Sequence, residues 1–391
     1  MALREFQSYD RPRRLFVQRA VWDLEHTQEI VREMPELTAE RVDSEADIHG
    51  ILDREEAPET VGKSYLYLAG NPNRFFKLCP GLVPDLACCD VHVLNFAVGC
   101  NLDCTYCFLQ TYLPYSLVTY FVNLDDMFRE LDELLEQRPR EFMRVCTGEL
   151  TDSLSLDPLV HLSRRLVTEF TRRERVSLEL KTKTANIAEL EGLDPKGRVI
   201  VSWTVNAESV SRREELRCVS LDERFRAAAQ AEAWGYRIGF HFDPIIHYPG
   251  WDEEYRRTVE RIFETVRPAS LAWISLGCLR FDPRLKEIVQ RRFPGSRFVY
   301  GEFIPGPDGK MRYPETLRVE MFSKMKEWIY AHWRRSGLPL ECLPLYLCME
   351  SYSVWEKVFG RAPRCRGDMA RMLDESIERP LHDLARTTRQ A

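Results

Sequence analysis

The chain has 391 residues, 44% of them hydrophobic and 30% charged, with a formal net charge of −6 at pH 7. This length predicts one large α/β domain with extensions, and the acidic charge argues against binding nucleic acid over the whole surface, although a local basic strip is not excluded. No apolar run is long enough for a membrane span and no secretory signal begins the sequence, so we expect a cytoplasmic protein without a membrane partner, in which the 12 cysteines stay reduced.

Predicted strands and helices alternate along most of the chain. Residues 26–57 are acidic and are expected to be helical at the surface. From about residue 91 onward, we predict strands at residues 91–98, 141–146, 176–181, 198–204, 236–242, 270–276 and 343–347. Helices are predicted at residues 124–135, 153–172, 185–192, 221–234, 252–266, 283–292 and 315–335. Such alternation predicts a parallel sheet curved into a partial or complete barrel, with the active site at the carboxyl ends of the strands.

A cysteine-rich loop, which we call the cysteine loop (residues 99–108), follows the first predicted barrel strand. It carries Cys100, Cys104 and Cys107 in a C-x3-C-x2-C spacing. Three thiolates on one loop can hold three corners of a [4Fe–4S] cluster and leave the fourth iron open to a small molecule. The alternatives are a zinc site or a purely structural cluster, but structural zinc needs four protein ligands and no C-x2-C pair recurs later in the chain.

Other cysteines have no such pattern. Cys88 and Cys89 are adjacent, which is poor geometry for a shared metal, and whether they and Cys79 hold a second metal stays open. The cysteines scattered singly later in the chain, Cys218 among them, are expected to be small buried hydrophobes.

Polar residues also end the next predicted strands. Gly148 and Glu149 follow the second strand, where glycine permits close backbone approach and the acid can face an ammonium group. Lys181 and Lys183 end the third strand, where one of them can face a carboxylate, and Thr204 ends the fourth and offers a hydroxyl. We expect these strand ends to form one cofactor site, with solvated strand ends as the alternative. His241, on the fifth strand, is expected to be a hydrogen-bonded core histidine.

The cysteine spacing, with Tyr106 just before the last cysteine, resembles that of the radical S-adenosylmethionine superfamily, and Gly148-Glu149 resembles its Gly-Gly-Glu motif. In that superfamily the methionine part of S-adenosyl-L-methionine chelates the open iron, and its reductive cleavage yields a 5′-deoxyadenosyl radical that abstracts a hydrogen atom from substrate. The resemblance therefore implies a [4Fe–4S] cluster on Cys100, Cys104 and Cys107 and an electron donor such as flavodoxin or ferredoxin.

Several segments resemble the spore photoproduct lyase family more closely: residues 104–111, 180–183, 205–207 and 235–251. This resemblance spans about residues 14–325. It implies a partial (β/α)6 TIM-type barrel at 91–300, an N-terminal α/β extension at 1–90, and a C-terminal hairpin and helical region at 301–391. The family converts a methyl-bridged thymine dimer in DNA back to two thymines. We therefore expect a radical lyase acting on thymine lesions in DNA, with a radical enzyme that modifies a small molecule or peptide as the alternative.

Individual positions can be carried over from the family. Its cofactor contacts fall on Thr151, Lys183 and Thr204, and Tyr106 matches a tyrosine that relays a hydrogen atom. A second relay tyrosine falls on Phe108, which has no hydroxyl, and the hydrogen-donor cysteine falls on Glu149, which has no thiol. The chain thus resembles a divergent member. Cys146, three residues earlier, and Cys348 are candidate replacements for the donor, with core packing as the alternative for both.

A hairpin is predicted at residues 298–313 around the turn Pro307-Asp308-Gly309. In the family such a hairpin inserts at the DNA lesion. Here we expect a basic strip of Lys310, Arg312 and Arg318, with Tyr313 available to stack on a base, and an ordinary solvated hairpin as the alternative. The sequence does not identify the substrate, the hydrogen donor or the oligomeric state.

Overall fold

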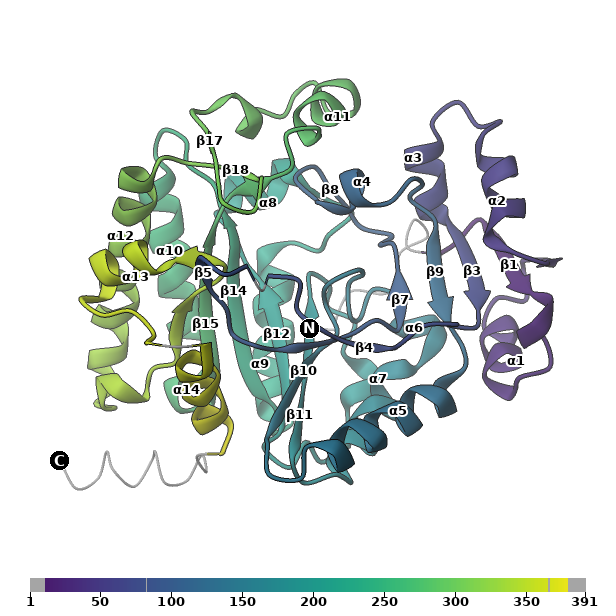
Figure 1. Cartoon of the computed structure of the whole chain (residues 1–391), viewed down its shortest axis with the longest axis horizontal. Coiled ribbons are helices and arrows are strands. Elements are labelled where there is room, and N and C mark those ends of the chain that lie inside the picture. Colours follow the sequence, from purple (N-terminus) through teal and green to yellow (C-terminus); the bar gives the residue numbers. More distant parts are fainter. Residues whose placement is uncertain (1–10, 82, 365, 379–391) are drawn as a thin grey trace.

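The computed structural model describes residues 11–81, 83–364 and 366–378 and contains two main sheets (Figure 1). The smaller, N-terminal sheet has the strand order β2–β1–β3–β9–β7. Its strands are β1 (Arg14–Gln18), β2 (Ala39–Val42), β3 (Tyr65–Ala69), β7 (Ala97–Val98) and β9 (Val118–Phe121). Neighbours in it are parallel, except that β7 runs antiparallel to β9. Because β7 and β9 come from the segment predicted to form the barrel, the two parts of the chain share this sheet.

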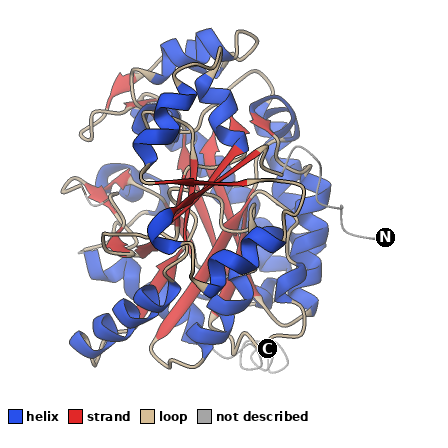
Figure 2. Ribbon diagram, turned by 90° about the vertical axis from the view of Figure 1, so that its right-hand side faces the viewer, coloured by secondary structure: helices blue, strands red, loops and turns tan. Residues whose placement is uncertain are grey.

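The larger sheet forms the barrel and has the strand order β19–β15–β14–β12–β11–β10–β6–β4. Its strands are β4 (Phe76–Leu78), β6 (His92–Leu94), β10 (Met143–Cys146), β11 (Val176–Thr182), β12 (Val199–Thr204), β14 (Arg237–Ile245), β15 (Leu271–Cys278) and β19 (Leu345–Leu347). From β6 to β19 the neighbours are parallel and follow chain order, whereas β4 pairs antiparallel with β6. This curled sheet, with helices outside it, confirms the predicted partial TIM-type barrel (Figure 2).

Helices lie between the barrel strands along the chain, and most of them cover the outer face of the sheet (Figure 1). They are α5 (Leu124–Gln137), α6 (Asp157–Val160), α7 (Leu162–Thr171), α8 (Glu208–Glu214), α9 (Leu221–Ala233), α10 (Trp251–Thr265), α11 (Leu285–Arg292) and α12 (Glu315–Arg335). The remaining helices are α1 (Glu25–Arg32), α2 (Glu45–Leu52), α3 (Pro58–Val61), α4 (Leu109–Tyr112), α13 (Tyr352–Phe359) and α14 (Arg366–Glu378). Short strands outside the main sheets are β5 (Leu86–Ala87), β8 (Asp103–Cys104), β13 (Glu215–Leu216), β16 (Arg280–Phe281), β17 (Ile304–Pro305), β18 (Met311–Arg312) and β20 (Glu350–Ser351).

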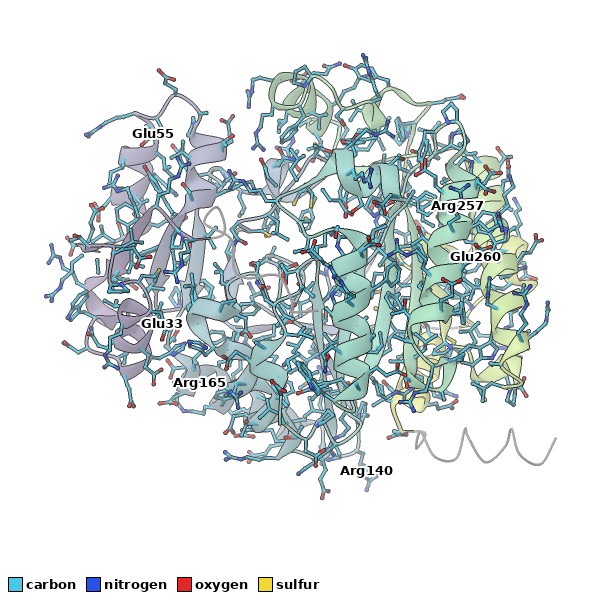
Figure 3. All side chains as sticks on the ribbon, turned by 180° about the vertical axis from the view of Figure 1, so that it is seen from behind. Glu33, Glu55, Arg140, Arg165, Arg257 and Glu260 are labelled. Carbon is cyan, nitrogen blue, oxygen red and sulfur yellow. The ribbon has the colours of Figure 1, made fainter. Side chains whose placement is uncertain are left out.

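The core lies between the barrel sheet and these helices. Every residue of β12 is buried, as expected for a strand that is covered on both faces. α5 buries one face, whose residues recur every three or four positions: Leu124, Met127, Leu131 and Leu135. Charged side chains such as Arg140 and Arg257 project from the outer surface (Figure 3). No helix in the described ranges is both long and apolar enough to cross a membrane.

Four predicted elements differ from the structure, the first being the helix predicted at 185–192, where only a short 3-10 helix forms, at Ala188–Leu190. Residues 26–57 contain β2 between α1 and α2, so this segment is not wholly helical. The strand predicted at 91–98 is two strands in different sheets, because the chain bends at Phe96, between β6 and β7. The helix predicted at 153–172 is divided at His161, which has a φ of +49°. The divisions predicted at residues 90 and 300 stay predictions, and residues 1–10 and 379–391 lie outside the described residues.

Candidate functional site

The cysteine loop follows β7 and leads into α4, and two features fix its shape. Gly99 has a φ of +86°, and a Cβ there would lie 2.0 Å from the Leu117 carbonyl oxygen, so the position requires glycine. The buried Lys63 ammonium donates to the carbonyl oxygens of Cys100 at 3.0 Å and Leu102 at 2.7 Å. Inside the loop, β8 pairs antiparallel with β13. The backbone of the loop is therefore held both by strand pairing and by a buried cation.

The chemistry of the thiols decides what this loop can hold. In the described ranges, no three side chains of Cys, His, Asp or Glu gather closely enough to bind a single metal ion. This holds for the three thiols of the loop and for three thiols near β4 and β5: Cys79, Cys88 and Cys89. A mononuclear zinc site would need its ligands about 2.1–2.3 Å from one centre, which argues against zinc. A [4Fe–4S] cluster instead takes one thiolate on each of three separate irons, and three cysteines on one loop fit it.

A fourth thiol faces the loop. Cys218 follows β13, and its Sγ lies 3.6 Å from the Sγ of Cys104. The pairing of β8 with β13, which sets Cys104 opposite Glu215, brings this segment to the loop. Our expectation that Cys218 is merely a small buried hydrophobe missed this contact. The two cysteines are 114 positions apart, and no spacing pattern connects them.

Tyr106 lies against a buried ion pair that connects the loop to β12. Its hydroxyl donates to the Glu215 carboxylate. Burial and the negative charge of Glu215 raise the pKa of Tyr106 well above its ordinary value. Glu215 pairs with Arg224 at 2.6 Å, and both side chains are fully buried. Arg224 also donates to the Thr204 carbonyl oxygen at 3.0 Å, at the end of β12. The Tyr106 phenol therefore keeps its proton, which it donates in the hydrogen bond to Glu215.

Asp152 connects the turn after β10 to the end of β11. Its carboxylate accepts a hydrogen bond from the backbone N–H of Lys183 at 2.7 Å. The Lys183 ammonium lies 5.8 Å from the centre of the Tyr106 ring. Burial disfavours its charge, but the neighbouring Cys104 and Glu215 outweigh burial and raise the pKa of Lys183. Lys183 and Tyr106, both predicted site residues, therefore lie side by side at the cysteine loop.

The turn after β10 carries the other predicted cofactor contacts. A Cβ at Gly148 would lie 2.7 Å from the Lys181 Cβ, so glycine lets the two strand ends pack this closely. Thr151 is 6% exposed, and its Oγ1 has no hydrogen-bond partner within the described structure. The Oδ1 of Asn101, in the cysteine loop, is buried and unpaired in the same way. Leaving such a group unpaired costs about 1–3 kcal/mol. These groups fit a polar ligand such as the cofactor that the resemblance implies.

Glu149 lies on the side of the site that faces the hairpin. Its carboxyl is half-buried, and burial raises its pKa above the ordinary value. Three nearby ammonium groups lower the pKa of Glu149, but by less than burial raises it. They belong to Lys181, Lys310 and Lys77. Lys310 belongs to the segment that joins β17 to β18. A carboxyl with a raised pKa therefore stands where the family resemblance placed a thiol.

Inside the barrel, His241 belongs to a buried polar network. One ring nitrogen lies 2.6 Å from a Glu179 carboxylate oxygen, and the other lies 2.6 Å from the Ser275 hydroxyl. Ser202 donates to the same carboxylate at 2.7 Å. The expectation of a hydrogen-bonded core histidine is confirmed. Cys146 borders Glu179, and burial raises the pKa of its thiol well above the ordinary value, which keeps the S–H bond that a hydrogen donor needs.

Cys348 follows β19, on the opposite wall of the barrel from the cysteine loop in the strand order. Its Sγ lies 3.8 Å from an Arg280 nitrogen, and Arg280 in turn pairs with Asp243 at 3.1 Å. Burial raises the pKa of the Cys348 thiol to about 12, so it too is neutral. Both candidate donor thiols thus keep their hydrogen, and their protonation does not distinguish them.

The predicted basic strip on the hairpin is wrong. β17 and β18 do form a hairpin, but Arg312 is only 4% exposed and pairs with Asp308 at 2.7 Å. Arg318 is 7% exposed and pairs with Glu350 at 2.9 Å. Each guanidinium group can be buried because a carboxylate partner is buried with it. Asp308 is close to Arg312 in sequence, whereas Glu350 is distant from Arg318. Neither guanidinium group is available to DNA phosphates.

The predicted stacking role of Tyr313 is also wrong. Its ring is 2% exposed and stacks on Phe303, with 4.8 Å between the ring centres. Its hydroxyl accepts a hydrogen bond from the His247 backbone N–H. Tyr313 therefore supports the hairpin from beneath, and Lys310 is the basic residue of the predicted strip whose side chain stays accessible.

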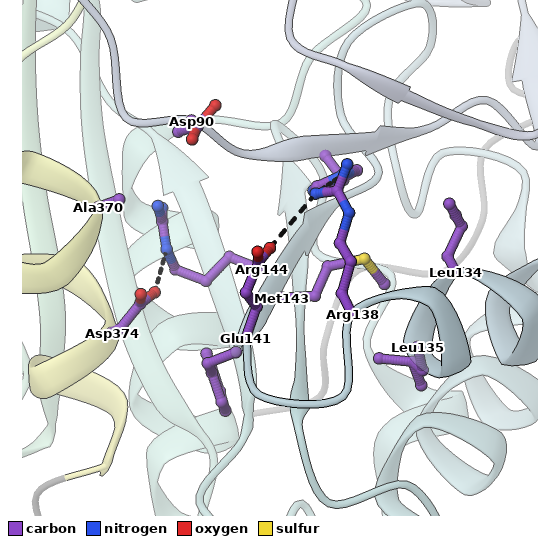
Figure 4. Close-up of a pocket in the computed structure, with 11 residues that line it drawn as sticks. Asp90, Leu134, Leu135, Arg138, Glu141, Met143, Arg144, Ala370 and Asp374 are labelled. Atoms are coloured by element: carbon purple, nitrogen blue, oxygen red, sulfur yellow. Dashed lines mark hydrogen bonds and ion pairs between the residues drawn. The ribbon is translucent and has the colours of Figure 1, made fainter. Parts of the chain in front are cut away.

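A separate pocket lies towards the amino-terminal end of β10, and none of the predicted site residues lines it (Figure 4). It is lined in part by Arg144, near the start of β10, and by Asp374 of α14, which accepts a hydrogen bond from Arg144 at 2.6 Å. Cys146, by contrast, ends this strand on the side of the cysteine loop. We therefore exclude this pocket from the candidate site.

Comparison with known proteins identifies relatives. A family model described as spore photoproduct lyase matches residues 89–305, more than half of the chain. The spore photoproduct lyase of Bacillus subtilis is 26% identical over 216 residues, which cover 54% of this chain and 63% of that protein. The lyase of Clostridium acetobutylicum is 23% identical over 305 residues, which cover 74% of this chain and 88% of that protein. The chain thus spans less than two thirds of the first of these relatives.

Solved structures show the same fold. A spore photoproduct lyase complexed with dinucleoside spore photoproduct matches with a TM-score of 0.75 and 21% identity, covering 86% of this chain and 98% of that chain. A variant of that lyase with bound AdoMet and the same dinucleoside also matches with a TM-score of 0.75.

Proposed function

The chain belongs to the spore photoproduct lyase family, and we propose that it is a radical S-adenosylmethionine enzyme that acts on thymine lesions in DNA. One observation carries this proposal. Lys183 lies beside Tyr106 of the cysteine loop, and Thr151 is left with an unpaired buried hydroxyl in the turn after β10. A fold without a polar ligand at this place would leave that hydroxyl uncompensated.

We assign the cofactors to the residues that fit them. Cys100, Cys104 and Cys107 would hold a [4Fe–4S] cluster. S-adenosyl-L-methionine would lie against the strand ends and would contact Gly148, Glu149, Thr151, Lys183 and Thr204. When bound, the two groups together supply a strong abstractor of hydrogen atoms.

The chain's own residues prepare this chemistry. Lys183 keeps its positive charge through the nearby Glu215, so it can face a carboxylate. Glu215 orients the Tyr106 hydroxyl, for which we propose the family's role in relaying a hydrogen atom. Cys146 is our first candidate for the thiol that returns a hydrogen to the substrate, and Cys348 is the second, because Glu149 has no S–H bond to give.

One observation favours a second candidate function. Arg312, Arg318 and Tyr313 are buried, so three of the four side chains expected to meet DNA are not available to it. A radical enzyme that modifies a small molecule or peptide would need no such surface. For either function we propose a cytoplasmic setting, where thiols stay reduced, and an electron donor such as flavodoxin or ferredoxin.

The test is anaerobic reconstitution followed by measurement of 5′-deoxyadenosine. We expect this product with S-adenosylmethionine and a reductant, and we expect more of it when DNA containing the methyl-bridged thymine dimer is added than when undamaged DNA is added. Cleavage that is indifferent to damaged DNA would favour the second function. No cleavage by a protein that contains its iron would contradict both.

A further inference from the structure

The contact between Cys104 and Cys218 is not used by the proposed reaction. The two sulfur atoms are 3.6 Å apart, within the range of a thiol–thiol hydrogen bond. Cys218 is partly exposed, so small reagents can reach the pair from solvent. In the described structure, the other two thiols of the cysteine loop, Cys100 and Cys107, form no such contact. One predicted cluster ligand therefore has a dedicated thiol neighbour.

The backbone fixes this neighbour in place. β13 pairs antiparallel with β8, and Glu215 lies opposite Cys104. The Cys218 backbone N–H then donates to the Glu215 carbonyl oxygen at 3.2 Å, which closes a turn. Arg224 holds both ends of this turn, through the Glu215 carboxylate and through the Val219 carbonyl oxygen at 3.1 Å. The separation of the two sulfurs is thus set by strand pairing and a buried cation.

We propose that Cys104 and Cys218 form a reversible disulfide whenever the cluster is absent. A disulfide needs an S–S distance of about 2.05 Å, so side-chain rotation has to bring the two sulfurs closer than their present 3.6 Å. With a peroxide as oxidant, the Cys104 thiol is oxidised to a sulfenic acid and one water leaves. The Cys218 thiol then attacks that sulfur, the S–S bond forms, and a second water leaves. In sum, two thiols and one hydrogen peroxide give one disulfide and two waters.

The disulfide has a consequence for the cluster, and this part rests on the proposed function. A cysteine loop with Cys104 in a disulfide offers two thiolates instead of three, so it cannot take up a cluster until a dithiol reduces it. Without Cys218, continued oxidation would carry Cys104 to sulfinic acid, which thiols do not reverse. Cys218 therefore preserves a ligand that would otherwise be lost.

A second group of thiols sharpens the design of the test. Cys88 is close enough to Cys79 and Cys89 to shift the pKa of both thiols, so oxidation can join those residues as well. A count of thiols lost is then ambiguous, and the bond itself has to be mapped. Trypsin helps, because cleavage after Arg217 and Arg224 releases Cys218 alone in a short peptide, residues 218–224. Cys104 lies in residues 78–129, which contain no Lys before their final Arg.

The experiment uses the full chain without iron, treated with equimolar hydrogen peroxide and digested without reduction. We expect mass spectrometry to find peptide 218–224 joined to peptide 78–129. The joined peptide should vanish in Cys104→Ser and persist in the matched control Cys342→Ser. Peptide 218–224 with a free thiol in the oxidised native protein, or a joined peptide that survives Cys104→Ser, would overturn the proposal.

A second measurement follows iron uptake. Oxidised native protein should take up iron and sulfide only after treatment with dithiothreitol. When both proteins are treated instead with excess hydrogen peroxide, Cys218→Ser should stay impaired after dithiothreitol, because a second peroxide then takes the Cys104 sulfenic acid to sulfinic acid. Full recovery of this variant would overturn the protective role. Failure of the untreated native protein to bind iron would instead contradict the cluster itself, and the peptide map would still decide whether the disulfide forms.

Discussion

Buried carboxylates have different partners on the two sides of the barrel, the side of the cysteine loop and the side of the hairpin. On the cysteine-loop side, Glu215 is paired with Arg224 at 2.6 Å and also accepts the hydrogen bond of Tyr106. On the hairpin side, Glu149 is half-buried among lysines, and burial raises the pKa of its carboxyl. The first arrangement holds a fixed geometry before any ligand binds. The second leaves a titratable group available.

This difference separates what the family shares from what this chain has changed. The cysteine-loop side carries the residues on which the resemblance rests. Its carboxylate Glu215 already has partners within the protein, Arg224 and Tyr106. The hairpin side carries Glu149 in place of a thiol and buries Arg312 against Asp308. We therefore propose that the cluster belongs to the first side, and that any change of substrate belongs to the second. The predictions below test this division.

The largest effect should come from the loop thiols. Replacing Cys100, Cys104 or Cys107 by Ala should abolish the cluster and all formation of 5′-deoxyadenosine, because two thiolates do not hold three irons. Iron content and product are measured on the reconstituted protein, with Cys342→Ala as the matched control. Normal iron and normal cleavage in a loop variant would contradict the assignment.

Breaking the buried ion pair should lower stability strongly. Glu215→Gln leaves the fully buried Arg224 charge without its counterion, and such a loss costs about 3–5 kcal/mol. The free energy of unfolding, measured by denaturant titration, should fall by this amount. Glu208→Gln removes an exposed pair with Arg212 and should change it by less than about 1 kcal/mol. Equal losses in the two variants would show that the cysteine-loop side is no more preorganised than the surface.

The hydrogen donor should give a smaller effect on rate. Native protein should repair a dinucleotide form of the methyl-bridged thymine dimer poorly, and Glu149→Cys should repair it roughly tenfold faster, which corresponds to about 1.4 kcal/mol in the barrier. Residual repair by the native protein should fall in Cys146→Ala or Cys348→Ala. Repair that survives loss of both thiols would refute the donor argument, and no repair by Glu149→Cys despite intact cofactor cleavage would indicate another substrate.

The smallest effect should be a pH dependence of stability on the hairpin side. The folded state raises the pKa of Glu149 above 4.5, so it binds this proton more tightly than the unfolded state does. The stabilisation is therefore full below the unfolded pKa and is lost as the pH rises through the folded pKa. Thermal unfolding should show the native protein losing stability relative to Glu149→Gln as the pH rises above 4.5. A difference that is independent of pH would mean that Glu149 does not titrate in this range.

Local signals were enough to predict the barrel and the loop. The strands at 176–181 and 198–204 are apolar runs that match β11 and β12 within one residue at each end, and the three cysteines are close in sequence. The contacts that sequence reasoning missed join distant positions. Cys218 meets Cys104 across 114 residues, and Arg318 finds Glu350 across 32. No sequence periodicity indicates such pairs. Arg312 and Arg318 were therefore predicted to be exposed, although both are buried in ion pairs.

The Lys63 ammonium has a consequence for cluster assembly. It binds the carbonyl oxygens of Cys100 and Leu102 and lies 3.7 Å from Asp103, so these contacts are made within the chain itself. Ordering a free backbone costs about 1–2 kcal/mol per residue in conformational entropy. In this loop the backbone is ordered during folding, because Lys63, which lies outside the barrel sheet, binds its carbonyl oxygens. Iron and sulfide would therefore arrive at a receptor that is already ordered, and little of their binding free energy would be spent on arranging the chain.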